Sequence, residues 1–476
     1  MKTRIYLLIS IFLFCGLLKA EAQNPDESYS AGLKQFKDSF AEFKDSINYV
    51  FAKYLAKSWE LFKVEPPLER PRKPDPPKMP VYIPDDTAVA DVTVVAEPAQ
   101  IDTTFIEPVI PKNNKQVVIE KSNTGSTINF FGNSLTFIPV EGYLTTLTGI
   151  NEKQVAAYWM QLSKTDFSNF VADLIRKETA LGLNSWGFYQ LVLKWADAHF
   201  TEQQKDEKNI FIVYVLNKAG YKAKIGRVNN NLFVMMAFLN KIYGKSYTRI
   251  GDDSYYIFSD QPTRAVASYR LNYETVTSYI DLRIQTFPRV KENISTVKRT
   301  FKEKEYAFKC NNNLTNFYKT IPQTDPGIYG NTPFSAIATQ SVIEELTNDL
   351  QNKTATEKLK FLLALIQYGF EYKTDEEQFG RETFFFAEET LFYPYSDCED
   401  RAILFCRMVK LLCNLDTLLI DYPNHVASAV KSNEPGDAVI YNNERYIVCD
   451  PSYIGASIGR TMVGCDNAKA RIIPIR

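Results

Sequence analysis

The spacing of hydrophobic positions changes several times along the chain, and each change predicts a different element. Between residues 30 and 63 the apolar side chains recur at steps of three and four, which predicts one amphipathic helix within a segment 30–64. These positions are Leu33, Phe36, Phe40, Phe43, Ile47, Val50 and Tyr54. Such a repeat fits a short coiled coil or a helix that docks on a partner or in an oligomer. It fits equally a helix that packs on its own domain.

The next segment, residues 65–112, is rich in proline. Eleven of the chain's 23 prolines fall between residues 66 and 111, so we expect an extended, semi-rigid linker. Globular patterns follow, with a hairpin predicted at 126–140 and helices up to about residue 200. Stretches such as SYIDLRI and KEYAFKC then predict a β-rich middle segment over residues 263–335.

The C-terminal region, residues 336–476, changes from a helical to a strand period. Helices are predicted at 338–352, 356–370 and 398–413, and strands follow in TLLIDY, HVASAV and RYIVCD. Helices followed by strands indicate an α+β fold with an antiparallel sheet. A similar order of helix and strands occurs before residue 262, where QKDEKNIFIVYVLNKAGYKAKIGRVNNNLFVMMAF resembles SDCEDRAILFCRMVKLLCNLDTLLIDYPNHVASAV in pattern. We therefore expect an internal repeat.

Length, charge and the N-terminus narrow the class of protein. A chain of 476 residues is expected to form about two or three domains. A net charge of −1 provides no long-range attraction for nucleic acid. Residues 1–22 have the pattern of a cleavable signal peptide, with Lys2 and Arg4 before an apolar run and an A-x-A motif ending at Ala22. No later stretch could span a membrane, so a secreted or periplasmic protein is expected.

Candidate catalytic residues lie in the C-terminal region, beginning with the stretch SDCEDRA. Cys398 falls in the first turn of a predicted helix, where the positive end of the helix dipole favours a thiolate. His425 opens the strand HVASAV, and Asp450 ends the strand RYIVCD. A thiol, an imidazole and a carboxylate in this arrangement can act as nucleophile, general base and orienting group.

Three acids, Asp397, Glu399 and Asp400, surround this cysteine and mark the stretch as partly exposed to water. We expect Glu399 and Asp400 to point away from the sulfur, with Arg401 offsetting their charge. The six cysteines outside the signal peptide show no disulfide framework and no paired spacing for a metal. No metal and no cofactor are therefore expected.

The motifs SDCEDRA, YPNHVASAV and VCDPSYIGASIG together resemble secreted bacterial members of the transglutaminase-like superfamily. The resemblance covers the chain from about residue 340 onwards. It implies a papain-like site in which Cys398 is the nucleophile, His425 the general base and acid, and Asp450 the orienting carboxylate. The superfamily includes amide cross-linkers, peptidases and deglycosylating amidases, which share acyl transfer through a thioester.

In this mechanism the Cys398 thiolate attacks an amide carbonyl, and His425 protonates the leaving amine. The backbone N–H of Cys398 is one candidate oxyanion donor, and Gln378 and Tyr395 are candidates for the second. We expect a cysteine-dependent amidohydrolase or peptidase acting on a peptide or protein amide. The alternatives are a non-catalytic envelope scaffold or binding protein, and a protein cross-linking acyltransferase.

The repeat gives the first copy different side chains at the site. Lys205 or Asp206 is expected at the cysteine position, Leu232 at the histidine position and Asp260 at the aspartate position. Lysine and leucine cannot supply the nucleophile and base here. Residues 113–262 are therefore expected to form a degenerate transglutaminase-like domain.

The proposed triad also predicts strand directions. His425 starts one strand and Asp450 ends another, so the two side chains can meet only if those strands run antiparallel. Asn442 and Asn443 suit a tight turn with positive φ, which supplies the necessary reversal. Residues 431–437 must then be an excursion or a wide bulge, after which AVIY continues in the direction of HVASAV.

Overall fold

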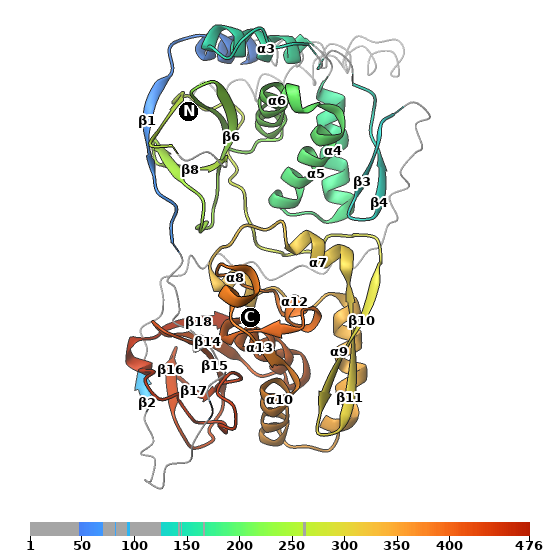
Figure 1. Cartoon of the computed structure of the whole chain (residues 1–476), viewed down its shortest axis with the longest axis vertical. Coiled ribbons are helices and arrows are strands. Elements are labelled where there is room, and N and C mark those ends of the chain that lie inside the picture. The colour runs from blue at the N-terminus through green and yellow to red at the C-terminus, as the bar shows by residue number, and fades with distance from the viewer. Residues whose placement is uncertain are drawn as a thin grey trace, which may run out of the picture.

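The structure is a computed structural model that describes residues 47–69, 81, 93–95, 125–140, 143, 145–164, 167–259 and 263–476. The predicted signal peptide and much of the predicted N-terminal helix and linker lie outside these ranges. Within them the chain forms two α+β units, which lie one above the other in Figure 1. No helix in these ranges combines the length and the apolar character that a membrane crossing needs.

The first unit places a group of helices beside a closed β-barrel (Figure 1). Its helices are α3 (Glu152–Lys164), α4 (Phe167–Leu181), α5 (Ser185–His199) and α6 (Lys205–Lys218). In hydrogen-bonded order, the barrel strands are β1 (Glu60–Glu65), β7 (Tyr247–Ile250), β8 (Asp253–Phe258), β6 (Asn231–Ala237), β5 (Ala223–Val228) and β9 (Ala265–Ser268). The hairpin predicted at 126–140 is confirmed as β3 (Thr127–Phe130) and β4 (Asn133–Thr136).

The second unit packs helices against an open six-stranded sheet. Its longer helices are α9 (Ala336–Leu350), α10 (Ala355–Gly369) and α13 (Cys398–Cys413), which confirm the three predicted helices to within two residues. The shorter ones are α7 (Asn312–Tyr318), α8 (Pro326–Gly330), α11 (Asp375–Phe379) and α12 (Ala387–Phe392). In order, the sheet contains β18 (Arg471–Ile475), β14 (Thr417–Asp421), β15 (Val426–Lys431), β17 (Glu444–Cys449), β16 (Ala438–Tyr441) and β2 (Thr93–Val95).

Helix α13 lies at the centre of this unit. It packs against β14 and β15 of the sheet and also against α10 and α12. Every residue from Cys398 to Val409 is buried. A helix covered on several sides needs apolar residues around most of its circumference, and the run Ala402–Phe405 supplies them.

The two units share one strand order. It is β9-β5-β6-β8-β7-β1 in the first unit and β18-β14-β15-β17-β16-β2 in the second. The first five strands of each order pair antiparallel throughout. The sixth strand comes from the N-terminal part of the chain in both units. β1 pairs on both of its edges and closes the barrel, whereas β2 pairs in parallel with β16 in an open sheet.

Strand pairing also shows which residues of the two units correspond. Leu232 and Val426 each pair with the residue five positions earlier, and both are buried towards the helices. Leu232 therefore matches Val426, and Asn231 stands at the place of His425. This corrects the expected match of Leu232 with the histidine by one residue, because the segment from the start of α6 to Arg227 of β5 is one residue shorter than the segment from the start of α13 to Asp421 of β14.

The other two site positions follow from the same comparison. Helix α6 begins at Lys205 as α13 begins at Cys398. The pairing of β8 with β6 matches that of β17 with β15, and it places Ser259 where the second unit has Asp450. Asp260, the expected counterpart, lies outside the described residues.

Residues 263–335, expected as a separate β-rich segment, divide between the two units. Strand β9 completes the barrel of the first unit. The hairpin of β10 (Ile294–Phe301) and β11 (Lys304–Asn311) packs against α9 and α10 of the second. The stretch SYIDLRI makes isolated bridges through Ser278 and Ile280 and is not a strand.

The described part of the predicted N-terminal helix packs on the first unit. Residues 47–55 are helical, and the chain enters β1 at Glu60, so the helix ends earlier than residue 63. Ile47, Phe51 and Leu55 are buried there, whereas Val50, expected on the apolar face, is 62% exposed. In this part of the chain, the helix therefore packs on its own domain, which was one of the two predicted arrangements.

Parts of the predicted linker also pair with the second unit. Thr93–Val95 forms strand β2 at the edge of the sheet, and Val81 makes a parallel bridge to Ile454. These residues of the segment 65–112, which was predicted to be a linker, therefore form part of the second unit.

We expect Leu232→Ala to destabilise the first unit by about 2–5 kcal/mol, because it removes a side chain that is 1% exposed and leaves a cavity. Denaturant unfolding would measure this loss. Leu239→Ala is the matched control, since Leu239 is 45% exposed and its truncation should cost roughly 0.5 kcal/mol or less. Equal losses in the two variants would contradict the packing described here.

Candidate active site

Cys398 occupies the first position of helix α13. The preceding strand β13 (Tyr395–Ser396) pairs in parallel with β12 (Glu371–Tyr372), and Asp397 in an extended conformation is the N-cap. The thiol therefore lies at the positive end of the helix dipole, as predicted. The side chain is 1% exposed.

His425 is the last residue of the loop between β14 and β15. The loop is closed by the backbone N–H of Tyr422, which donates to the carbonyl of His425 at 2.8 Å. The Tyr422 ring stacks parallel to the imidazole, with 6.2 Å between centroids, and its hydroxyl donates to Asn467 Oδ1 at 2.6 Å. The stacked ring and the closed loop restrict the imidazole, which is only 3% exposed.

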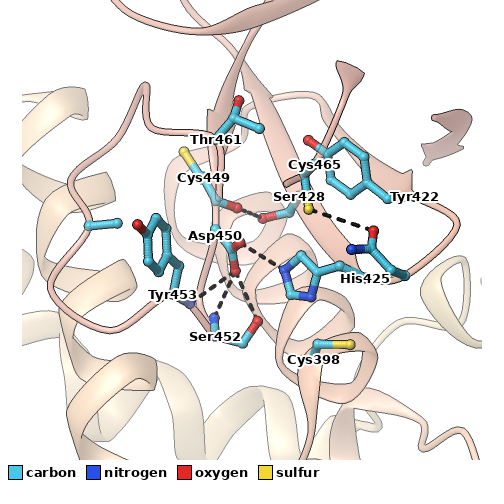
Figure 2. Close-up of polar contacts among 12 residues, drawn as sticks. Cys398, Tyr422, His425, Ser428, Cys449, Asp450, Ser452, Tyr453, Thr461 and Cys465 are labelled. Carbon is cyan, nitrogen blue, oxygen red and sulfur yellow. Dashed lines mark hydrogen bonds and ion pairs between the residues drawn. The ribbon is translucent and has the colours of Figure 1, made fainter. Parts of the chain in front are cut away.

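Asp450 directly follows β17 and meets His425 across the sheet. His425 Nε2 lies 2.8 Å from Asp450 Oδ2 (Figure 2). The other carboxylate oxygen accepts hydrogen bonds from the backbone N–H and hydroxyl of Ser452 and from the N–H of Tyr453. Because a carboxylate accepts, the Nε2 atom of His425 is the donor in this pair. Figure 2 shows Cys398 on the opposite side of the imidazole from Asp450.

The strand directions confirm the topological prediction. β15 and β17 run antiparallel, and β16 also pairs antiparallel with β17, so β16 runs in the direction of β15. Asn442 and Asn443 both have positive φ in the turn between β16 and β17. Between β15 and β16 the chain crosses β17, where Arg445 donates to the carbonyls of Ser432, Glu434 and Gly436.

Gln367 fixes the turn that carries Asp450. This residue lies on α10 and is 3% exposed. Its Nε2 donates to the carbonyls of Asp450 at 3.0 Å, Tyr453 at 2.9 Å and Ala456 at 3.1 Å. The helix and the turn are thus joined directly. Nothing in the sequence around Gln367 indicated this role, because its partners are more than 80 residues away.

Arg401 fixes the start of α13 from inside the protein. Its guanidinium is buried and donates to the carbonyls of Ile366 and Phe370 at the end of α10, and to that of Ser396. Burial lowers the pKa of Arg401 to about 10, so the group still carries its charge at neutral pH. It interacts electrostatically with Cys398, and a cation near a thiol favours the thiolate.

The sequence predicted that the acids around Cys398 are partly exposed to water, but in the structure they are fully buried. Asp397, Glu399 and Asp400 are each 0% exposed. Asp400 Oδ1 accepts a hydrogen bond from the backbone N–H of Phe385 at 2.9 Å. Glu399 does not point away from the sulfur, since Cys398 Sγ donates to Glu399 Oε2 at 2.9 Å. Tertiary packing of α12 and α13 covers this turn, which its charged composition did not indicate.

A third carboxylate joins this turn from α11. One oxygen each of Asp375, Asp397 and Glu399 lies within 4.8 Å of the others, and all three residues are buried. Carboxylate oxygens at this spacing could hold a hard cation such as Ca²⁺ or Mg²⁺. The expectation of no metal rested on cysteine spacing, which does not bear on this oxygen cluster.

The candidate oxyanion donors differ in their surroundings. Gln378 donates to the carbonyl of Lys373 at 3.2 Å and so stabilises its own turn. Tyr395 lies on β13, three residues before Cys398, and is partly exposed. The backbone N–H of Cys398, in the first turn of α13, has no acceptor within its own helix.

At the equivalent junction of the first unit, side-chain hydrogen bonds join the helix to the strand. Asp206 Oδ1, near the start of α6, accepts a hydrogen bond from the backbone N–H of Leu232 at 2.7 Å. One turn later, Asn209 Nδ2 donates to the carbonyl of Leu232 at 2.8 Å. The helix and strand are joined there by side chains that lack a thiol or an imidazole.

No family model matches the chain, and no curated protein or solved structure is significantly similar to it. What the protein does is therefore inferred from the geometry of its own residues.

We expect Gln367→Met to lower the free energy of unfolding by about 1–3 kcal/mol, because the variant keeps the side-chain size but leaves buried carbonyls without their donor. Urea unfolding would measure the loss. Gln340→Met is the matched control, since Gln340 is exposed on α9 and should cost roughly 0.5 kcal/mol or less. A loss in Gln367→Met no larger than in the control would contradict the role assigned to Gln367.

Proposed function

We propose that the protein is a cysteine-dependent amidohydrolase or peptidase of transglutaminase-like type, which acts outside the cytoplasm. Cys398 is the nucleophile, His425 the general base and acid, and Asp450 the orienting carboxylate. The observation that supports this most strongly is the buried 2.8 Å contact between His425 Nε2 and Asp450 Oδ2 beside Cys398. It fixes the tautomer that leaves Nδ1 as the base.

The reaction begins when the Cys398 proton passes to His425 and the thiolate attacks the carbonyl carbon of an amide. The backbone N–H of Cys398 donates to the oxyanion of the tetrahedral intermediate. His425 then returns the proton to the amine nitrogen, the C–N bond breaks, and a thioester remains on Cys398. Water, deprotonated by His425, attacks the thioester carbonyl carbon, and the C–S bond breaks. The carboxylic acid is released, and His425 returns the proton to Cys398.

The burial of the site favours a second candidate, a non-catalytic scaffold or binding protein. Cys398 is 1% exposed and His425 is 3% exposed, so an amide substrate cannot reach the sulfur without a local opening. A scaffold needs no such opening. The two candidates differ in whether the thiol reacts with electrophiles and with amides.

Cys398 should be the fastest-alkylating cysteine of the folded protein. Burial raises the pKa of Cys406 to about 12 and also raises the pKa values of Cys310, Cys413 and Cys449, so these thiols stay protonated near neutral pH. Brief treatment with iodoacetamide followed by mass spectrometry would show the order of labelling. His425→Ala should slow labelling of Cys398 near pH 7, because the thiol loses the group that accepts its proton.

Cys465 provides the matched control in this experiment, since it is partly exposed and Asn424 is its hydrogen-bond partner. His425→Ala should leave its labelling rate unchanged. If Cys406, Cys413 or Cys449 is labelled before Cys398 in the folded protein, the catalytic assignment is wrong.

Amide turnover would separate hydrolysis from the alternatives. We expect peptide substrates to be cleaved by the wild type, and Cys398→Ala to reduce the rate by at least about 10³-fold, the scale seen when a catalytic nucleophile is removed. Adding a primary amine distinguishes an acyltransferase, since the thioester would then yield a new amide. A reactive Cys398 without turnover of any amide would favour the scaffold.

A further inference from the structure

A cavity in the first unit lies apart from the candidate active site. It is lined by the last turn of α4, the start of α5 and the segment 281–286, and α4 and α5 pack side by side (Figure 1). Its volume is about 320 Å³. That volume holds roughly ten water-sized groups, which is enough for a small organic ligand. Thr179 and Gln285 in its lining are exposed, so a ligand can enter from solvent.

Hydrogen bonds between side chains and backbone fix the walls of this cavity. Ser185 Oγ accepts a hydrogen bond from the backbone N–H of Asp281 at 2.6 Å. Asn184 Nδ2 donates to the carbonyl of Arg283 at 3.1 Å. The Oδ1 atom of the same asparagine accepts from the N–H of Gly187 at 2.9 Å and so caps α5. The start of α5 and the segment 281–286 are thus joined, and a ligand need not order the lining when it binds.

The charged groups of the lining leave one negative charge uncompensated. Asp281 and Arg283 neutralise each other, with Arg283 Nε 2.8 Å from Asp281 Oδ2. Glu178 on α4 accepts a hydrogen bond from the hydroxyl of Tyr221 at 2.9 Å. Within the residues that the structure describes, no lysine or arginine forms an ion pair with this carboxylate. Burial raises the pKa of Glu178, as it does for a carboxyl group that has no cation beside it.

Two features of the lining favour an anion instead, and both are already compensated. The N-terminus of α5 carries a partial positive charge of about half a unit, and Asn184 accepts from that end of the helix. Arg283 carries a full charge, but two of its nitrogen atoms lie within 2.8 Å of Asp281 Oδ2. The full negative charge of Glu178 is larger than the partial charge of the helix, so the cavity favours a cation.

The number of oxygen ligands distinguishes a metal ion from an organic cation. Calcium takes about six to eight oxygen ligands, and magnesium is held by carboxylates in octahedral geometry. The cavity offers two carboxylates, and that of Asp281 already binds Arg283. Among the described residues, a cluster of three metal-binding side chains occurs at the start of α13 and not at this cavity. A primary ammonium group has only three hydrogen bonds to donate, so it needs fewer acceptors than a metal ion.

We propose that this cavity binds the primary ammonium group of a small amine or of a lysine side chain, with the carboxylate of Glu178 as the counter-ion. The methylene chain next to the ammonium packs on Leu183, which also lines the cavity. The site is separate from the candidate active site, and this inference does not depend on the proposed function.

Calorimetric titration of the wild-type protein tests the preference for a cation. The probes are cadaverine, a five-carbon diamine, and the uncharged five-carbon diol of the same length. At about pH 8 and low ionic strength the carboxylate is ionised and screening is weak. We expect the diamine to bind at least about tenfold more tightly than the diol, because hydrogen bonds between charged groups are the stronger ones. Equal affinities, or no binding of the diamine at millimolar concentrations, would overturn the proposal.

Glu178→Gln tests the position of the site, because the amide keeps the side-chain size and an acceptor for Tyr221 but removes the charge. It should weaken binding of cadaverine by about tenfold or more. Glu202→Gln is the matched control, since Glu202 is exposed between α5 and α6 and its loss changes the net charge equally. The control should bind cadaverine as the wild type does. Equal affinities in the two variants would place the amine elsewhere and overturn the proposal.

If Glu178→Gln does not fold, Gln285→Lys decides the outcome. Gln285 is exposed in the same lining, so the substitution should be tolerated, and the added cation should weaken binding of cadaverine by about threefold or more. Gln340→Lys adds the same charge on the exposed face of α9 and is its control. Equal affinities in these two variants would overturn the proposal.

A further probe, lysine with both its α-amino and carboxyl groups blocked as amides, distinguishes the two sources of the ammonium group. Tighter binding of this probe than of cadaverine would identify a lysine side chain of a peptide as the ligand. Tighter binding of cadaverine would identify a free amine. Either result sustains the ammonium site, provided that Glu178→Gln weakens the binding.

Discussion

Burial of the first turn of α13 is the constraint on which the second unit depends. A guanidinium and several carboxylates are removed from water there, and each buried charge is costly unless other groups compensate it. Arg401 donates to carbonyls at the end of α10, and Asp400 accepts from the backbone before α12. These contacts connect three helices around one turn. The same contacts determine where Cys398 lies, so the position of the thiol follows from how the charges are compensated.

The imidazole and its carboxylate depend on a different framework, the antiparallel pairing of β15 with β17. That pairing brings the start of one strand to the end of the other, and so brings His425 to Asp450. Gln367 joins the two frameworks, because it extends from a helix that packs on α13 to the turn after β17. A site assembled in this way is sensitive to the packing between helix and sheet.

The two units have the same strand order but form different sheets, one a closed barrel and the other open. In the first unit, β1 pairs on both edges and closes a barrel whose interior is filled by alternate side chains of the strands. In the second unit the sheet stays open, and the end of β17 carries the acid of the candidate site. At the helix–strand junction of the first unit, Asp206 and Asn209 bind the backbone of Leu232. Polar side chains there connect elements, and none of them is a nucleophile.

Much of the second unit could be predicted from local pattern alone. The bounds of α13 and of the strands after it follow from hydrophobic period. The directions of β15, β16 and β17 were predicted from the requirement that His425 and Asp450 meet, together with the turn at Asn442 and Asn443. The meeting of His425 with Asp450 was predicted from side-chain chemistry and from the resemblance that the motifs carry, and antiparallel pairing is the geometry that allows it.

Contacts between residues far apart in the chain could not be predicted in this way. Local composition marked Glu399 as a residue exposed to water, yet packing by α12 and α13 buries it against the sulfur. Gln367 resembled any other helix residue, and only the fold brings it to three carbonyls more than 80 residues away. The sequence by itself determined the elements and the identity of the catalytic candidates, because these depend on short-range periodicity and side-chain chemistry. Only the tertiary structure decided which charges are buried and what they contact, because burial depends on segments that the local sequence does not contain.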